Sequence, residues 1–359
     1  MNQEKAIRFL YDLVSIYSPS LAERAVAERA LCELKDLGFR SAHIDEAGNV
    51  VGQWGKPGAL RKIALVGHID TVKGELPVTI TDTAHGEVLT GRGSVDAKGP
   101  FATFVYAVAN LPLNIDTEFT VVGAVEEEVA SSKGARYLAR TMQSPDAVII
   151  GEPSQTAGIT LGYKGRLIVE ATAQRSMTHS AHQHISVAEL LIDYFTAVRN
   201  WVAGKNEHKT NAFETIDLTI QNFNTESDGL TERGKITLGF RLGIGFHPAS
   251  VQEDLIKLNS SPSNINLHAM GREIPVRFDK KMPLANIFRA AIRHHGLEPR
   301  LFLKTGTSDM NVLAQSWNCP MLAYGPGDSS LDHTPEEHIL VADYLKAIQI
   351  LSDALTRIN

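Results

Sequence analysis

The chain shows two kinds of hydrophobic pattern, one in its N-terminal and C-terminal parts and another in its middle. In the N-terminal and C-terminal parts, short, nearly continuous apolar runs bounded by glycine or polar residues alternate with segments whose apolar residues recur at helical spacing. The runs predict strands at 49–54, 62–66, 118–125, 146–150, 301–303 and 320–324. The periodic segments predict helices at 4–17, 20–37, 100–109, 133–142, 284–295 and from 341 onward. Strands that are apolar on both faces and alternate with helices are typical of an α/β sheet.

Local signals predict where the second of these helices begins and ends. Ser20 with Glu23 three residues later forms a capping-box pattern, which places the helix start at Ser20. Gly38 follows the last apolar residue and suits the position just beyond a helix C-terminus.

The pattern changes over the middle of the chain. Strand-like segments are expected at 166–174, 215–222, 234–242 and 265–269, and helices at 186–202 and 248–258. The order strand–helix–strand–strand–helix–strand is that of a ferredoxin-like α+β domain. Because the first pattern resumes near Pro275, we predict that residues 164–274 form a domain inserted into another built from 1–163 and 275–359.

Composition and charge narrow the class of protein. The chain has 359 residues, 43% of them hydrophobic and 21% charged, which suits a folded protein of about two domains. Its formal charge of -6 argues against a nucleic-acid-binding protein or a polybasic membrane-surface protein. The N-terminus shows no signal-peptide pattern, and no apolar stretch approaches the roughly 20 residues of a spanning helix. The sequence therefore predicts a cytoplasmic protein.

One histidine stands where an α/β sheet gathers its ligands. His68 directly follows the apolar run 63–67, and Asp70 comes two residues later. Ligands of open α/β sheets bind at the carboxyl ends of the strands. Asp70 could accept the second ring N–H of His68 and fix its tautomer, as carboxylates do behind metal-bound histidines. The pair alone is a weak signal, since most histidines at strand ends are satisfied by hydrogen bonds.

Four more segments bring carboxylates or histidine to predicted strand ends. They carry Asp96, Glu126–Glu128, Glu152 and His333. Simpler interpretations exist: Asp96 could cap the following helix, and the three glutamates could be a solvated charge run. Together, however, two histidines and several carboxylates with no cysteine form a ligand set suited to zinc or a similar divalent ion in an open, catalytic site.

These segments also resemble a known family. The matching motifs are 67–72 (GHIDTV), 91–99 (GRGSVDAKG), Glu127-Glu128, 151–153 (GEP) and His333. They are similar to the successive motifs of the dinuclear-zinc amidohydrolases and exopeptidases, a family that includes acetylornithine deacetylase, succinyl-diaminopimelate desuccinylase and carboxypeptidase-G type enzymes. The resemblance covers essentially the whole chain. It implies a zinc-exopeptidase-like catalytic domain with a mixed sheet between helices, and an inserted lid and dimerisation domain.

The resemblance also implies two divalent metal ions, with zinc expected and cobalt as the alternative. Asp96 would bridge the two ions. His68 and Glu152 would complete one site, and Glu128 and His333 the other.

Catalytic roles follow from the same motifs. Glu127 would be the general base that activates a water between the metals, and Asp70 would orient His68. A lid histidine would stabilise the tetrahedral oxyanion, often across a dimer interface, so a homodimer is expected. His179 matches that position best, and His182 is a competitor. The peptide bond between Asp96 and Ala97 is expected to be cis.

Three segments near the C-terminus narrow the substrate. The segments 304–311, 323–329 and 331–337 are similar to the corresponding segments of a group of bacterial and archaeal hydrolases. Those enzymes release lysine or ornithine from a small amino-group carrier protein, whose C-terminal glutamate blocks the α-amine of the amino acid. This resemblance implies a role in lysine and arginine biosynthesis. Arg241 occupies the place of a lid arginine that could bind the α-carboxylate of the product. Asp309 is a candidate for its side-chain ammonium.

Other functions remain open at this stage. An N-acetylornithine or N-acetyl-lysine deacetylase, or a related small-substrate deacylase or dipeptidase, is the main alternative. A metal-free scaffold is the alternative outside enzymes, although every ligand and the base are retained. An acidic carrier would require a local basic rim, for which the candidates are Lys205, Lys209, Lys280, Lys281 and Arg300.

Overall fold

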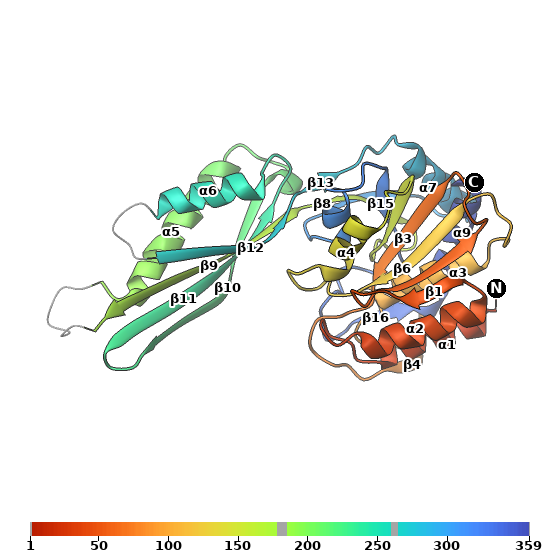
Figure 1. Cartoon of the computed structure of the whole chain (residues 1–359), viewed down its shortest axis with the longest axis horizontal. Coiled ribbons are helices and arrows are strands. Elements are labelled where there is room, and N and C mark those ends of the chain that lie inside the picture. The colour runs from red at the N-terminus through yellow and green to blue at the C-terminus, as the bar shows by residue number, and fades with distance from the viewer. Residues whose placement is uncertain (1, 178–184, 260–264, 359) are drawn as a thin grey trace. The chain divides into compact units, whose positions relative to one another are not determined.

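The computed structural model describes residues 2–177, 185–259 and 265–358 (Figure 1). The chain forms two compact units. The first contains 1–162, 278–303 and 308–359, and the second contains 163–277 and 304–307. The sequence predicts that a lid domain of residues 164–274 is inserted into a catalytic domain. These domain boundaries and the lid role stay predictions.

A mixed sheet forms the centre of the first unit. Its strands lie in the order β1-β2-β6-β3-β7-β15-β8, and β14 pairs with β8. The four neighbours β6, β3, β7 and β15 run parallel. The strand bounds are Arg40–Ile44 (β1), Val50–Gly55 (β2), Lys62–His68 (β3), Glu118–Ala124 (β6), Ala147–Gly151 (β7), Gly158–Tyr163 (β8), Arg300–Lys304 (β14) and Met321–Ala323 (β15).

Helices cover both faces of this sheet (Figure 1). One continuous apolar core joins the sheet to α1, α2, α3, α7 and α9. Buried apolar residues of α4 lie outside that core, and α4 contacts α8. The helix bounds are Gln3–Ser15 (α1), Arg24–Leu37 (α2), Lys98–Ala109 (α3), Lys133–Thr141 (α4), Pro283–His294 (α7), Asp309–Leu313 (α8) and Val341–Ile358 (α9).

A small antiparallel sheet of the first unit was not expected from the sequence. It has the order β16-β5-β4, with bounds His338–Leu340 (β16), Thr79–Thr83 (β4) and Gly86–Thr90 (β5). All residues of β4 are exposed, and β16 is three residues long, so neither produces the apolar run that marks a buried strand.

The second unit confirms the ferredoxin-like arrangement. Its sheet has the order β10-β11-β9-β12 and is antiparallel throughout. Helices α5 and α6 pack on one face around a separate apolar core. The bounds are Gly165–Ser176 (β9), Val187–Asn206 (α5), Ile216–Ser227 (β10), Thr231–Leu242 (β11), Pro248–Leu258 (α6) and Ile265–Glu273 (β12). The predicted fold class is therefore correct.

The predicted start of the second helix is wrong. Helix α2 begins at Arg24, and its preceding residue Glu23 makes no side-chain capping bond. The Ser20 hydroxyl donates instead to Asp70 Oδ2 at 2.7 Å, and Glu23 Oε1 accepts from the N–H groups of Leu21 and Glu126. These side chains hold distant segments together, which a local capping pattern cannot reveal. The predicted end is correct, because Gly38 has φ +90°.

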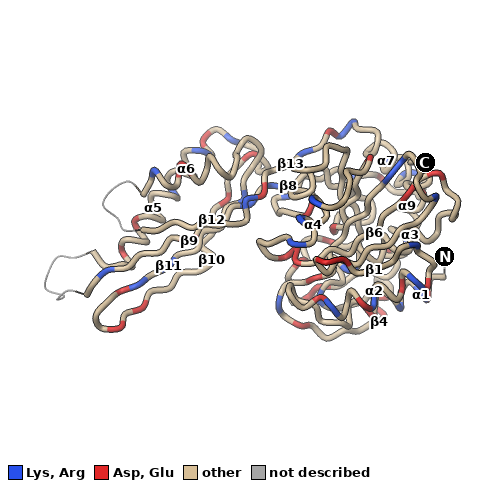
Figure 2. The backbone as a smooth tube through the Cα atoms, in the orientation of Figure 1, with Lys and Arg blue, Asp and Glu red and all other residues tan. Residues whose placement is uncertain are grey.

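No helix within the described residues combines the length and apolar character needed to cross a membrane. Positive and negative side chains occur along the chain in both units (Figure 2).

Strands β3 and β7 approach each other closely at two glycines. A Cβ on Gly151 would lie 2.8 Å from Gly67 Cα and 3.0 Å from the Phe104 ring. We predict that Gly151→Ala lowers the free energy of unfolding by about 1–3 kcal/mol through overpacking. Gly204→Ala in α5 is the matched control: a new Cβ there meets nothing within 4 Å. It should be neutral or stabilising by up to ~1 kcal/mol. Urea unfolding of both variants measures this, and equal stabilities would contradict the packing argument.

Candidate metal centre

The register of the parallel strands brings the predicted ligands to one edge of the sheet. Gly67 pairs with Gly151, and His68 pairs with Ala124. His68 therefore ends β3 beside the loop after β6, which carries Glu127 and Glu128, and beside Glu152, which follows β7. Because parallel strands end at the same edge, three chain segments far apart in sequence deliver their side chains to one place.

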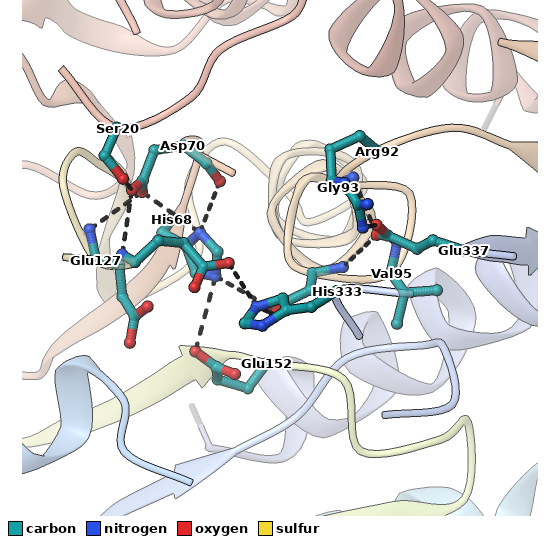
Figure 3. Close-up of polar contacts among 12 residues, drawn as sticks. Ser20, His68, Asp70, Arg92, Gly93, Val95, Glu127, Glu152, His333 and Glu337 are labelled. Atoms are coloured by element: carbon teal, nitrogen blue, oxygen red, sulfur yellow. Dashed lines mark hydrogen bonds and ion pairs between the residues drawn. The ribbon is translucent and has the colours of Figure 1, made fainter. Parts of the chain in front are cut away.

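Asp96 contacts both predicted histidine ligands, which Figure 3 labels. Its Oδ1 is 3.0 Å from His68 Nε2, and its Oδ2 is 3.1 Å from His333 Nε2. His333 Nε2 is also 3.0 Å from Glu128 Oε1. The two oxygens of one carboxylate thus face two different histidines, which is the arrangement expected of a carboxylate shared by two ions.

Glu152 and Glu127 border the same group (Figure 3). Glu152 Oε1 lies 4.0 Å from His68 Nε2. Glu127 is buried, and its pKa is raised well above its usual range. Burial is the main cause, and the neighbouring charges of Glu152, Asp309 and Glu128 add to it against the opposing effect of His68.

Asp70 anchors the loop that carries the two glutamates. Its Oδ1 accepts the N–H of Glu127 and its Oδ2 the N–H of Glu128, both at 3.1 Å. The nearest acceptor to His68 Nδ1 is the main-chain oxygen of Asp70 at 3.0 Å, whereas the carboxylate Oδ1 is 3.5 Å away. Burial opposes the charged form, but hydrogen bonds from His68, Ser20 and Glu128 hold the pKa of Asp70 below its usual value.

The central carboxylate and its histidine partners are strongly coupled. Burial opposes ionisation of Asp96, yet the hydrogen bonds from His333 and His68 hold its pKa well below the usual range. The same contacts with Asp96 and Glu128 raise the pKa of His333 to about 11. Burial and the Asp96 charge raise the pKa of Glu128. Without cations, the group therefore depends on protonated histidines to offset its carboxylates.

The donor set fits divalent cations. His68, Asp96 and Glu128 each offer one ligand atom, and these three atoms lie within 4.8 Å of one another. The donors are imidazole nitrogens and carboxylate oxygens, which suit zinc and similar ions. A second such group within the described residues is His294, His295 and Asp353. There, however, Asp353 already accepts two bonds from the Arg357 guanidinium, so the first group is the stronger candidate.

The two predicted substrate residues belong to different units. Asp309 is buried in the first turn of α8, in the same unit as the metal group. Arg241 lies on β11 in the second unit, where its Nη1 donates to the Thr307 hydroxyl at 2.8 Å. The lid-histidine candidates His179 and His182 lie outside the described residues.

Two features bear on the loop that carries the central carboxylate. The peptide bond between Asp96 and Ala97 is cis, as expected. The sequence interpretation gave no role to Glu337, whose buried carboxylate is bonded to the same loop. Its position four residues after His333 in a matching motif was the one signal that could have drawn attention to it.

Comparisons with known proteins show the family and the fold of the chain. Residues 64–357 match the sequence profile of peptidase family M20/M25/M40. The chain is 43% identical to the [LysW]-lysine hydrolase of Deinococcus radiodurans, over 99% of this chain and 97% of that protein. A putative [LysW]-lysine/[LysW]-ornithine hydrolase of Pyrococcus horikoshii is 35% identical over 100% and 99% of the two chains. The M20 family metallo-carboxypeptidase Sso-CP2 from Sulfolobus solfataricus shares the fold, with a TM-score of 0.78, 20% identity and 98% coverage of both chains.

Metal loading should release protons, because histidine binds a metal only in its neutral form. The pKa of about 11 means that His333 carries a proton in the metal-free protein near neutral pH. Metal and proton compete, so the affinity for Zn²⁺ should rise with pH between about pH 6 and pH 8. Calorimetric titration in buffers of different ionisation enthalpy counts the protons released, and His333→Ala should release about one fewer. An affinity that falls as pH rises would contradict this interpretation.

Proposed function

The chain belongs to peptidase family M20/M25/M40, and we propose that it is a metal-dependent amide hydrolase that releases lysine, ornithine or both from the C-terminal glutamate of an amino-group carrier protein. The observation that carries the hydrolase assignment is the Asp96 carboxylate, which faces His68 on one oxygen and His333 on the other. Similarity over nearly the whole length to proteins named for LysW-linked substrates supports the substrate.

Five side chains would hold two divalent ions. Asp96 would be shared, with His68 and Glu152 on one side and Glu128 and His333 on the other. Bound at this edge of the sheet, the ions would polarise the amide carbonyl and lower the pKa of a water molecule. Zinc is the ion we expect, with cobalt as the alternative.

Glu127 would act as the general base and then as the general acid. It is buried beside the ligand Glu128, and its raised pKa gives it a stronger affinity for a proton than an exposed glutamate has. Ionised, Glu127 takes a proton from the attacking water. Protonated, it returns that proton to the amine of the departing amino acid, so that its charge is restored at the end of the cycle.

Two residues would bind the charged groups of the substrate. The Arg241 guanidinium can bind a carboxylate with two parallel hydrogen bonds, which suits the α-carboxylate of lysine or ornithine. The buried Asp309 carboxylate is the candidate to pair with the side-chain ammonium, because the two groups have opposite charges. Asp70 would position His68 and the loop of Glu127, as its hydrogen bonds indicate.

Further expectations belong to the same proposal. A lid histidine, His179 or His182, would stabilise the oxyanion across the interface of a homodimer. The carrier would be acidic and would meet a basic rim. The enzyme would act in the cytoplasm, in lysine or arginine biosynthesis.

Replacing the base should stop turnover and leave the metals in place. Glu127→Gln keeps the size of the side chain but cannot accept a proton, so kcat should fall by about 10²–10⁴-fold. Glu87→Gln, at an exposed position of strand β5, is the control and should leave kcat unchanged. Steady-state kinetics with metal analysis of both variants measure this. Substantial turnover by Glu127→Gln with both metals bound would overturn the base assignment.

The main alternative is a deacetylase acting on small free substrates. If the carrier is recognised, kcat/KM for carrier-linked lysine or ornithine should exceed that for N-acetyl-lysine and N-acetylornithine by at least about 10²-fold, because the free substrates lack the binding energy of the carrier. Parallel assays of the purified protein on the four substrates decide this. Faster turnover of an acetylated amino acid would reject the carrier-linked substrate and favour the deacetylase.

A further inference from the structure

The carboxylate of Glu337 is fully buried and completely surrounded by donors. Its Oε1 accepts the main-chain N–H groups of Gly93, Val95 and Asp96 at 2.9, 3.0 and 3.1 Å. Its Oε2 accepts from Arg92 Nη1 at 2.8 Å. All these donors belong to residues 92–96, the segment that ends at Asp96, and Figure 3 labels Arg92, Gly93 and Val95 beside Glu337.

The main chain places Glu337 inside this loop. Strand β16 pairs with β5 with His338 opposite Thr90, and the Gly91 N–H donates to the main-chain oxygen of Glu337 at 3.2 Å. The pairing thus continues up to the start of the loop. From there the N–H groups of Gly93, Val95 and Asp96 point at the Glu337 carboxylate and form a set of donors of the kind that binds anions elsewhere. Here the anion is a side chain of the protein itself.

The surroundings favour a charged carboxylate over a neutral amide. Arg92 is buried, and its Nε is held by the main-chain oxygen of Gly74 at 3.0 Å, so its guanidinium is fixed toward Glu337. Four donors converge on the two oxygens. A glutamine would direct its own NH₂ group at one of these donors, leaving two donors face to face in a buried site.

Glu337 is also close in sequence to His333, the proposed ligand on the other side of Asp96. His333, four residues earlier, faces the opposite oxygen of Asp96, and its backbone has φ +63°, in the left-handed region that most side chains disfavour. The short connection between them anchors His333 at one end. Movement of Glu337 would therefore displace two ligands, one through the N–H of Asp96 and one through the chain to His333.

We propose that Glu337 is a positioning residue of the metal centre, which sets the separation of Asp96 and His333 by binding inside the loop 91–96. The proposal rests on the proposed metal centre and is independent of the identity of the substrate. Residues that orient metal ligands through hydrogen bonds typically change metal affinity by 10–100-fold when they are replaced.

The test measures binding of Zn²⁺ alone to metal-free protein, by competition with a chromophoric chelator. Glu337→Gln should weaken Zn²⁺ binding by about 10–100-fold. Glu336→Gln is the matched control, because Glu336 is adjacent and exposed, and it should bind Zn²⁺ like the wild type. Glu337→Asp keeps the charge but is one methylene shorter. It should also weaken binding, and it provides a second variant if the first does not fold.

Two further readouts separate positioning from a general structural role. Thermal unfolding of the metal-free variants reports stability alone, and kinetics with saturating metal should show kcat reduced while KM changes by less than about threefold. A folded Glu337→Gln or Glu337→Asp protein with wild-type Zn²⁺ affinity would overturn the proposal, whatever its stability. Wild-type protein that binds no Zn²⁺ would instead reject the metal centre on which the proposal rests.

Discussion

The fold must hold several carboxylates close together in a buried place. Two unit charges 4 Å apart interact by about 4 kcal/mol at the effective dielectric typical of such pairs, so a group of buried carboxylates is costly unless cations offset it. Asp96, Glu127, Glu128 and Glu152 converge at one sheet edge, and two histidines whose pKa values are raised there, His68 and His333, offset them only in part. The raised pKa of Glu127 and the lowered pKa of Asp96 are two responses to this single constraint.

The protein divides its buried carboxylates into two groups. Asp70 and Glu337 are satisfied by main-chain N–H groups, and each holds a loop that carries proposed ligands. Asp96, Glu128 and Glu152 instead keep their oxygens near histidine nitrogens, where a cation would bind. The first group makes the second possible, because a loop fixed through its N–H groups can hold like charges together.

Much of this arrangement could be predicted from the sequence because it depends on local patterns. Apolar runs placed the buried strands, and His68, the segment Glu126–Glu128 and Glu152 each followed such a run closely, so the shared edge of a parallel sheet implied their convergence. The rest depends on contacts between distant segments. Ser20 and Glu23 form a capping pattern in sequence but bind Asp70 and the Glu126 N–H, and Glu337 reaches a loop about 240 positions away. The small sheet of β4, β5 and β16, which ends beside Glu337, has no long apolar run to reveal it.

The proposed function requires that the Asp96 carboxylate be shared by two metal ions at the sheet edge. Anomalous diffraction at the zinc absorption edge, from crystals of the zinc-loaded protein, can locate these ions. We expect two anomalous peaks about 3.5–4 Å apart, with the Asp96 carboxylate between them and His68 and His333 on opposite sides. A single peak, or peaks only at His294, His295 and Asp353, would contradict it.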